Sequence, residues 1–174
     1  MFDRLPNVVN PLRMAESGQI LTGDISLTSM ARLSQQLVDQ VGTVSTRLEF
    51  GVDAQKICYL DGQFSSKLAL ICQRCMRPMT YRVDTGFKLA FVESESEAEQ
   101  LPEEYEPCIL EEHTVTLTTL IEDELMLSLP IVPMHDSDVC KVNYSFGEKG
   151  AESEADMTDK INPFSELEKL KTKR

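Results

Sequence analysis

Apolar residues recur every three or four positions in one stretch of the first quarter of the chain. This spacing is typical of one face of an amphipathic helix. A Thr or Ser at position 28 or 29 can cap its start, and Gly42 can end it. We therefore predict a helix over about residues 29–41, preceded by a short strand or extended arm over residues 20–25. The helical positions are Met30, Leu33, Leu37, Val38 and Val41.

The hydrophobic period then changes to two, which indicates strands with one buried face. Residues 44–52 and 57–59 follow this period, and Asp61-Gly62 is a two-residue hairpin signal before residues 64–71. After Pro78, the odd positions 79–91 are largely apolar. They predict one long strand or a hairpin bent at Gly86.

The later part of the chain mixes an acidic stretch with a second helical pattern. Residues 93–107 are rich in glutamate and predict an acidic loop. A short extended stretch then leads to a predicted helix over about residues 118–129, which Pro130 stops. Near the end, Asn162-Pro163-Phe164 reads as an N-cap, a first-turn proline and an aromatic anchor of a short helix.

Together these elements predict an α+β fold. We expect a mainly antiparallel sheet of about five to seven strands with two or three short helices. Residues 1–146 should form a single domain that carries the acidic loop 93–107. Residues 147–174 should form a mobile acidic linker and a short C-terminal helix.

Charge is distributed very unevenly. The net charge is -12, yet residues 1–92 carry 10 Lys and Arg against 8 Asp and Glu, whereas residues 93–159 carry 2 against 19. The acidic part should attract basic partners and repel a phosphate backbone. Around residues 67–88 basic residues predominate, among them Arg74, Arg77 and Arg82, and this part could attract a phosphate backbone.

Composition restricts the compartment. Five cysteines are an odd number that does not suggest a secreted disulfide framework, so a reducing cytoplasm is expected. The N-terminal residues lack the apolar core of a signal peptide, and no apolar run reaches the roughly 18 residues that cross a bilayer. We therefore predict a cytoplasmic protein without a membrane partner.

Two thiols separated by two residues, Cys72 and Cys75, form half of a metal-ligand pattern. Zinc favours sulfur and nitrogen in a tetrahedron, and this spacing lets one turn present both sulfurs. His135 and Cys140 can supply the other half, so we predict a structural zinc site formed by these four residues. The alternative is no cofactor, with free thiols in a reducing cell.

Other readings of the chemistry remain open. Cys108 and His113 compete for the second half of the metal site, and Cys58 is expected in the core. The thiol pair suggests a redox role only weakly, because strand patterns rather than a helix flank it. We expect no enzyme, since nucleophile and phosphate-loop motifs are missing. The acids at 122–124 should lie on a solvated helix face, with a magnesium site as the alternative.

Several segments along the chain are distinctive in their order and composition. In chain order they are Cys72-Gln73-Arg74-Cys75, Leu101-Pro102-Glu103-Glu104-Tyr105-Glu106-Pro107, Ile121-Glu122-Asp123-Glu124, Leu129-Pro130-Ile131-Val132-Pro133-Met134-His135-Asp136-Ser137, Cys140 and Asn162-Pro163-Phe164. Through these segments the chain resembles the YceD family of large ribosomal RNA subunit accumulation proteins. The resemblance implies a bacterial factor needed for normal synthesis, processing or accumulation of 23S ribosomal RNA, without an established catalytic activity.

The resemblance names a process, and the charges suggest how the protein acts in it. The acidic region would bind a basic ribosomal protein, or the chain would bind large-subunit ribosomal RNA, or both. The predicted RNA-binding residues are Arg74, Arg77 and Arg82, with Tyr81 available for stacking on a base. The alternative is a zinc-stabilised protein that acts directly on pre-ribosomal RNA. We expect no small-molecule substrate. The predicted partner-binding residues are Glu103, Glu104, Tyr105, Asn162, Pro163 and Phe164.

Overall fold

The computed structural model describes residues 5–110, 112–136 and 139–140. The chain divides into two units, Met1–Val142 and Asn143–Arg174, and every described residue belongs to the first. The linker and helix predicted over residues 147–174 therefore lie outside the described residues. The same holds for Asn162, Pro163 and Phe164.

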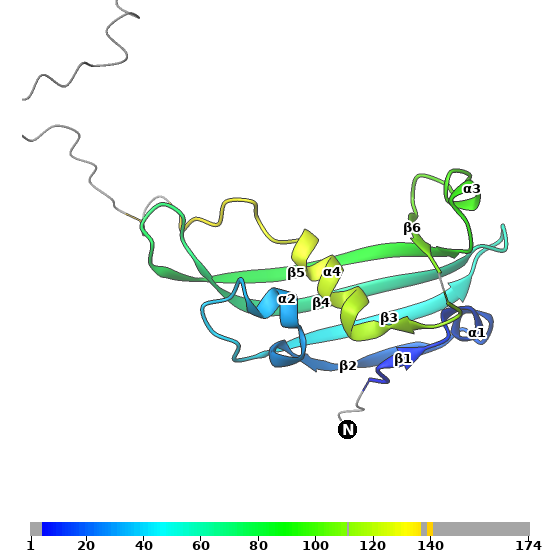
Figure 1. Ribbon diagram of the computed structural model, residues 1–174, viewed down its shortest axis with the longest axis horizontal. Coiled ribbons are helices and arrows are strands. Elements are labelled where there is room, and N and C mark those ends of the chain that lie inside the picture. The colour runs from blue at the N-terminus through cyan, green and yellow to red at the C-terminus, as the bar shows by residue number, and fades with distance from the viewer. Residues whose placement is uncertain (1–4, 111, 137–138, 141–174) are drawn as a thin grey trace, which may run out of the picture. The chain divides into compact units, whose positions relative to one another are not determined.

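A five-stranded sheet in the order β2-β3-β4-β5-β6 forms the centre of the first unit (Figure 1). Neighbouring strands are antiparallel except β5 and β6, which are parallel. A separate antiparallel pair joins β1 to β7. The strands are β1 (Val8–Val9), β2 (Ile20–Ser26), β3 (Thr43–Val52), β4 (Cys58–Ile71), β5 (Pro78–Val92), β6 (Glu106–Ile109) and β7 (Val115–Thr116).

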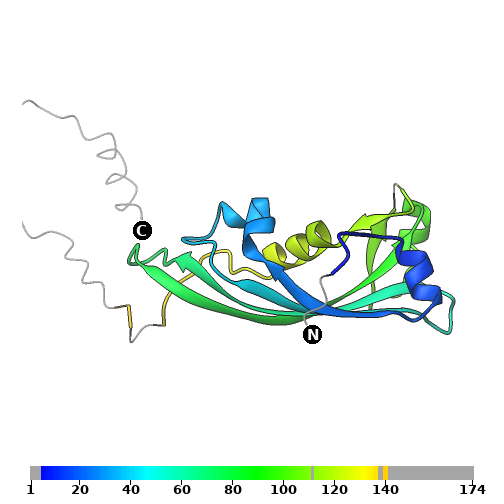
Figure 2. The same ribbon diagram turned by 90° about the horizontal axis from the view of Figure 1, so that it is seen from below.

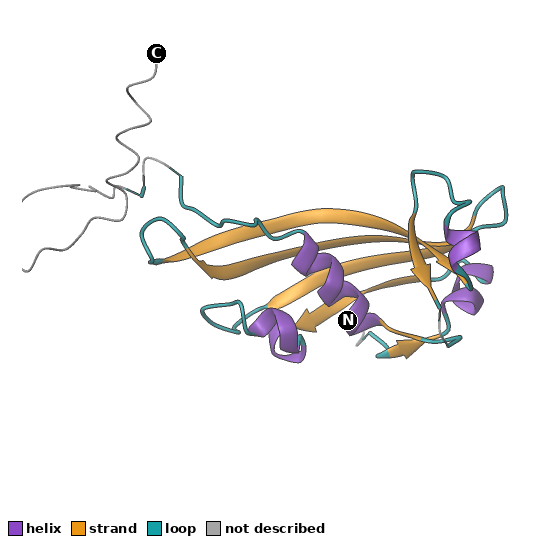
Figure 3. Ribbon diagram, turned by 45° about the horizontal axis from the view of Figure 1, so that its top comes forward, coloured by secondary structure: helices purple, strands orange, loops and turns teal. Residues whose placement is uncertain are grey.

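Helices α2 and α4 lie over one face of this sheet, and no helix of the described residues covers the other face (Figures 2 and 3). The result confirms the predicted α+β class and its mainly antiparallel sheet. The described residues contain seven strands, as expected, but four α-helices rather than two or three. The helices are α1 (Pro11–Glu16), α2 (Ala31–Ser34), α3 (Glu95–Ala98) and α4 (Leu117–Leu127), with one 3-10 turn, η1 (Leu27–Ser29).

The core fills the space between the sheet and its helices. Even-numbered side chains of β3 and β4 and odd-numbered side chains of β5 point into it, because side chains alternate along a strand. Phe50 and Phe91 stack there with ring centroids 6.3 Å apart. No helix among the described residues is long and apolar enough to cross a membrane.

The helix predicted over residues 29–41 is wrong in extent. Only Ala31–Ser34 is α-helical, and the backbone N–H of Val38 donates to the carbonyl oxygen of Ala69 at 2.8 Å. That bond draws the chain toward β4 instead of continuing the helix. Val41, which the helical pattern placed on the buried face, is 84% exposed.

The hairpin predicted at Asp61-Gly62 is also wrong, because both residues lie inside β4. Gly62 pairs with Leu48 on one side and with Phe87 on the other. A Cβ atom at this position would lie 2.2 Å from Cζ of Phe87, so the glycine makes room for an aromatic ring. It is therefore a packing glycine of a central strand and not a turn residue.

The turn between β3 and β4 begins at Asp53. Its carboxylate accepts hydrogen bonds from the backbone N–H groups of Gln55 and Ile57, both at 2.8 Å. Lys56 takes the left-handed conformation, with φ 68°. This arrangement is a common turn chemistry for aspartate.

The later elements follow the prediction more closely. The long strand predicted after Pro78 is β5, unbroken at Gly86. The predicted helix over residues 118–129 is α4, whose bounds differ by one or two residues. The acidic stretch 93–107 is not wholly a loop, since it contains α3 and the start of β6.

Candidate metal centre

The turn between β4 and β5 carries the paired cysteines. The backbone N–H of Cys72 donates to the carbonyl oxygen of Arg77 at 3.0 Å, and that of Met76 donates to Cys72 at 2.9 Å. Met76 takes the left-handed conformation, with φ 57°. These features close the turn tightly at Pro78, where β5 begins. The prediction that both thiols sit between adjacent antiparallel strands is confirmed.

The segment after α4 comes back to this turn. The backbone N–H of Gln73 donates to the carbonyl oxygen of Pro133 at 2.8 Å, which holds the segment before His135 beside the turn. The backbone N–H of His135 then donates to Sγ of Cys72 at 3.4 Å. A further turn, with Cys140 N–H donating to the carbonyl oxygen of Asp136 at 3.1 Å, brings in the last thiol.

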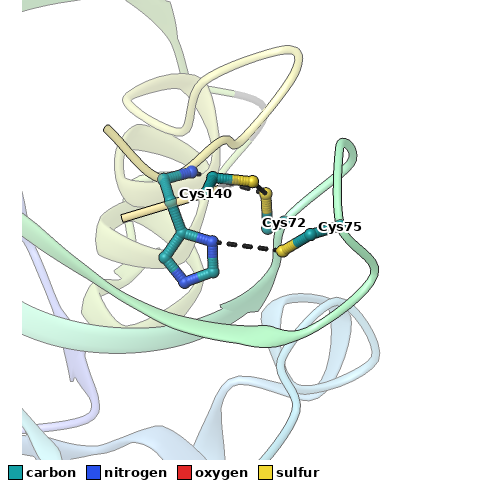
Figure 4. Close-up of side chains that lie close together, drawn as sticks. Cys72, Cys75 and Cys140 are labelled. Atoms are coloured by element: carbon teal, nitrogen blue, oxygen red, sulfur yellow. Dashed lines mark hydrogen bonds between the residues drawn. The ribbon is translucent and has the colours of Figure 1, made fainter. Parts of the chain in front are cut away.

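The four predicted ligands meet in one cluster (Figure 4). Their ligand atoms all lie within 4.8 Å of one another. Sγ of Cys72 and Sγ of Cys140 are 3.8 Å apart, and Sγ of Cys75 is 3.4 Å from Nδ1 of His135. A tetrahedron with zinc–sulfur bonds of about 2.3 Å has sulfur–sulfur edges of about 3.8 Å. The donor set and its spacing therefore fit Zn²⁺.

Hydrogen bonds prepare part of the cluster for a cation. Burial disfavours the Cys72 thiolate, but backbone N–H groups of His135, Cys75 and Arg74 outweigh it and lower the pKa of Cys72 to about 5. Burial likewise opposes the Cys75 thiolate, while the backbone N–H of Arg77 contributes most to a lowered pKa. Both thiols are thus inclined to the ionised form that binds metal.

The pKa values of the other two candidate ligands, Cys140 and His135, are raised rather than lowered. Burial, together with hydrogen bonds to the thiols of Cys75 and Cys72, raises the pKa of Cys140 to about 11. The hydrogen bond to Cys72 is the main cause of the raised pKa of His135. A cation at the centre would reverse both trends, since it favours thiolate and neutral imidazole.

The competing cysteines lie elsewhere. Neither Cys108 nor His113 belongs to any group of three or more metal-binding side chains in the described ranges. Cys108 is half-buried and packs against the core, as Cys58 does. Burial raises the pKa of both thiols, which keeps them in the neutral, unreactive form.

The acidic residues of α4 do not all lie on a solvated helix face, as the sequence predicted. Glu122 is not solvated but buried, and its carboxylate accepts hydrogen bonds from the backbone N–H groups of Arg32 and Leu33. Asp123 forms an ion pair with Arg32. The sequence hides this arrangement, because the partner helix lies 90 residues earlier.

The predicted RNA-binding residues do not form one surface. Arg74 and Arg77 lie in the cysteine turn, and Nη2 of Arg74 lies 3.8 Å from Sδ of Met134. Arg82 is exposed on the helix-free face of the sheet. Tyr81 points to the other face, where it packs against the core. Lys67, directly opposite Arg82 on β4, was not among the predicted site residues.

Among the predicted partner-binding residues, Glu103 and Glu104 are exposed. Glu104 accepts a hydrogen bond from Nζ of Lys88 at 3.1 Å. Tyr105 is buried, and its hydroxyl donates to Asp53 at 3.0 Å. Nζ of Lys88 also lies 4.5 Å from the centroid of the Tyr105 ring, so these contacts fasten the acidic stretch to the sheet.

Fold and cluster together define a small α+β protein with four Cys and His ligands gathered at a β-hairpin turn, the donor set of a structural zinc site. The chain belongs to the family of the large ribosomal RNA subunit accumulation protein YceD, whose model matches residues 60–171. A curated relative from Haemophilus influenzae, a large ribosomal RNA subunit accumulation protein YceD, is 33% identical over 171 residues. The match covers 98% of each chain. No solved structure matches significantly.

Proposed function

We propose that this protein is a non-enzymatic ribosome biogenesis factor that supports the accumulation of large-subunit ribosomal RNA. It would do so by binding a basic ribosomal protein, ribosomal RNA or both. The process follows from the family and from the full-length relative. The mode of action rests on the arrangement of charge along β5.

The observation that carries this proposal is that opposite charges follow the two ends of one strand. Arg74 and Arg77 precede the start of β5 at Pro78, and the acidic residues begin directly after its end at Val92. Because β5 has 15 residues, its ends are about 50 Å apart. Two partners of opposite charge therefore fit on one molecule without competing for the same surface.

The acidic end is suited to a basic protein segment. The sequence has no Lys or Arg between residues 93 and 140, so the charges that this stretch contributes are all negative. Of these acids, Glu104, Glu122 and Asp123 are paired with Lys88 or Arg32. The contacts of Tyr105 and Glu104 with the sheet hold part of this region in place before binding, which lowers the cost of association. The exposed acidic side chains, which we call the acidic end, are Glu93, Glu95, Glu97, Glu99, Glu103, Glu104, Glu106 and Glu112.

The cysteine turn supports the second candidate function, a zinc-stabilised protein that binds pre-ribosomal RNA directly. Zinc at the Cys72, Cys75, His135 and Cys140 cluster would fix the turn that carries Arg74 and Arg77. A rigid turn loses less conformational freedom when its arginines bind phosphate. The ion's role here is to hold the backbone, with no part in a reaction.

The test of the acidic end is capture of ribosomal proteins from nuclease-treated extract by the full-length chain. Wild type should retain basic large-subunit proteins, identified by mass spectrometry, and Glu99→Lys/Glu103→Lys should lose them. Glu16→Lys/Asp39→Lys makes the same charge change at exposed residues outside the acidic end and should retain them. Loss of every ribosomal protein after nuclease treatment rejects the adaptor function.

The RNA-binding arm is tested separately by a gel shift with large-subunit RNA over a range of salt concentrations. Arg77→Glu should weaken the shift and flatten its salt dependence. An unchanged shift removes the cysteine turn from the RNA interface.

A further inference from the structure

One face of the sheet is turned away from α2 and α4 (Figure 2), and we call it the outer face. It carries polar side chains in regular rows. Ser45, Ser65 and Asp84 are direct neighbours across β3, β4 and β5. In the next row, Lys67 of β4 is directly opposite Arg82 of β5. All five residues are exposed.

The Lys67 and Arg82 pair places two positive charges side by side. Residues directly opposite on antiparallel strands have Cβ atoms about 5 Å apart, and like charges there are destabilising. Within the described part of the chain, neither side chain forms an ion pair, although Arg47 on the same face pairs with Glu49 at 3.3 Å. An anion between Lys67 and Arg82 would remove this repulsion.

A groove of about 570 Å³ runs beside the pair. Thr43, Ser45 and Ser65 line it together with Lys67 and Arg82, and the Ser45 hydroxyl donates to Oδ1 of Asp24 at 2.6 Å. Two cations and several hydroxyl donors are the groups that bind phosphate oxygens. Its lining contains no aromatic side chain, so the groove offers no platform for stacking a base.

We propose that this outer groove binds the sugar-phosphate backbone of single-stranded RNA, with Lys67 and Arg82 on one phosphate. This proposal rests on the part of the proposed function in which the protein binds ribosomal RNA. It adds an RNA-binding surface that is distinct from the cysteine turn. Recognition here is independent of base sequence, because only backbone groups of the nucleic acid find partners.

Asp84 gives the groove a means to select RNA. It lines the groove two residues from Arg82 on the same side of β5 and opposite Ser65. A carboxylate repels a second phosphate but accepts a hydrogen bond from a ribose 2′-hydroxyl, the group that DNA lacks. The charge pattern of the groove thus fits an alternation of phosphate and ribose.

The test is fluorescence anisotropy of the full-length protein with labelled oligo-U and oligo-dT of equal length. Lys67→Ala/Arg82→Ala should weaken oligo-U binding about tenfold and reduce the salt slope by about one. Arg47→Ala removes a cation from the same face, but one already paired with Glu49, and should change binding little. Asp84→Ala should bring the two affinities together by strengthening oligo-dT binding.

Three outcomes overturn the proposal. One is oligo-U affinity unchanged in Lys67→Ala/Arg82→Ala while Arg77→Glu weakens it, which leaves the proposed function intact. Another is an equal loss of oligo-U affinity in Arg47→Ala, which would mean that RNA is attracted by the positive charge of the whole face and not by this pair. The third is displacement of oligo-U by inorganic phosphate at an equal concentration of phosphate groups, which assigns the groove to a free anion. Circular dichroism melts confirm that each variant is folded.

Discussion

The carboxylate of Glu122 in α4 accepts a hydrogen bond from the backbone N–H of Leu33 in α2 at 3.0 Å. It also accepts one from the N–H of Arg32 at 2.7 Å. The residue at the start of α2, Met30, provides no side-chain cap. A side chain from a helix much later in the sequence therefore caps α2 and joins the two helices over the sheet.

We expect Glu122→Ala to lower the free energy of unfolding by about 2–3 kcal/mol. The substitution leaves two backbone N–H groups without their acceptor in a buried place and removes a charge-assisted hydrogen bond. Urea denaturation followed by circular dichroism measures the change. Asp123→Ala removes a half-exposed partner of Arg32 and should cost less than about 1 kcal/mol. Equal costs for the two variants would contradict the capping role.

Stability should depend on pH through the same carboxylate. Burial opposes ionisation of Glu122, but hydrogen bonds from Leu33, Arg32 and the Arg32 side chain outweigh it, so the folded pKa lies below the ordinary value of 4.5. The stabilisation is therefore complete above the unfolded pKa and is lost as the pH falls through the folded pKa. The unfolding free energies of wild type and Glu122→Gln should differ constantly between about pH 6 and 8 and converge below about pH 4. If the difference in unfolding free energy grew as the pH fell, the folded pKa of Glu122 would have to lie above the ordinary value, which would contradict this prediction.

The cysteine cluster should bind about one zinc ion per chain. Elemental analysis of protein purified without chelator is the measurement, and Cys75→Ser should reduce the zinc content strongly, because three ligands hold the ion less well than four. Cys58→Ser changes a thiol outside the cluster and should keep the metal. A fully folded wild-type protein that contains no metal would end the zinc assignment.

Gly62→Ala should destabilise the protein by about 1–3 kcal/mol, because its Cβ would press on the ring of Phe87. That ring cannot move freely, since it packs against the core and lies 6.0 Å from the ring of Phe64. In a double-mutant cycle, Phe87→Leu should recover part of the loss, giving a clear coupling energy. Additive effects would mean that the glycine is needed for another reason.

The sequence predicted which side chains meet in the cysteine cluster better than it predicted the register of the sheet. Cys72, Cys75, His135 and Cys140 are recognisable because few residue types bind zinc, so chemistry alone limited the choice of partners. The predicted register between β3 and β4 was wrong because Asp61-Gly62 was assigned to a hairpin turn. The sequence of these two residues cannot distinguish a turn from a strand in which the glycine makes room for an aromatic ring. The pairing of Lys67 with Arg82 follows instead from the cysteine turn, which the sequence placed between two adjacent antiparallel strands.

The local pattern of hydrophobic and polar residues also could not predict contacts between residues far apart in the sequence. The stripe that ends at Val41 has helical spacing, yet a single hydrogen bond from Val38 to Ala69 ends the helix early. Glu122 resembles a surface residue because its neighbours along the chain are acidic. Its burial depends on two N–H groups supplied 90 residues earlier.

Cys72 and Cys140 are separated by 68 positions along the chain, and everything between them, including β5, the acidic end and α4, lies within the ring that a shared ion would close. A metal crosslink that closes so long a loop lowers the conformational entropy of the unfolded chain far more than that of the folded chain. The amount of folded protein would then follow the zinc available to the cell.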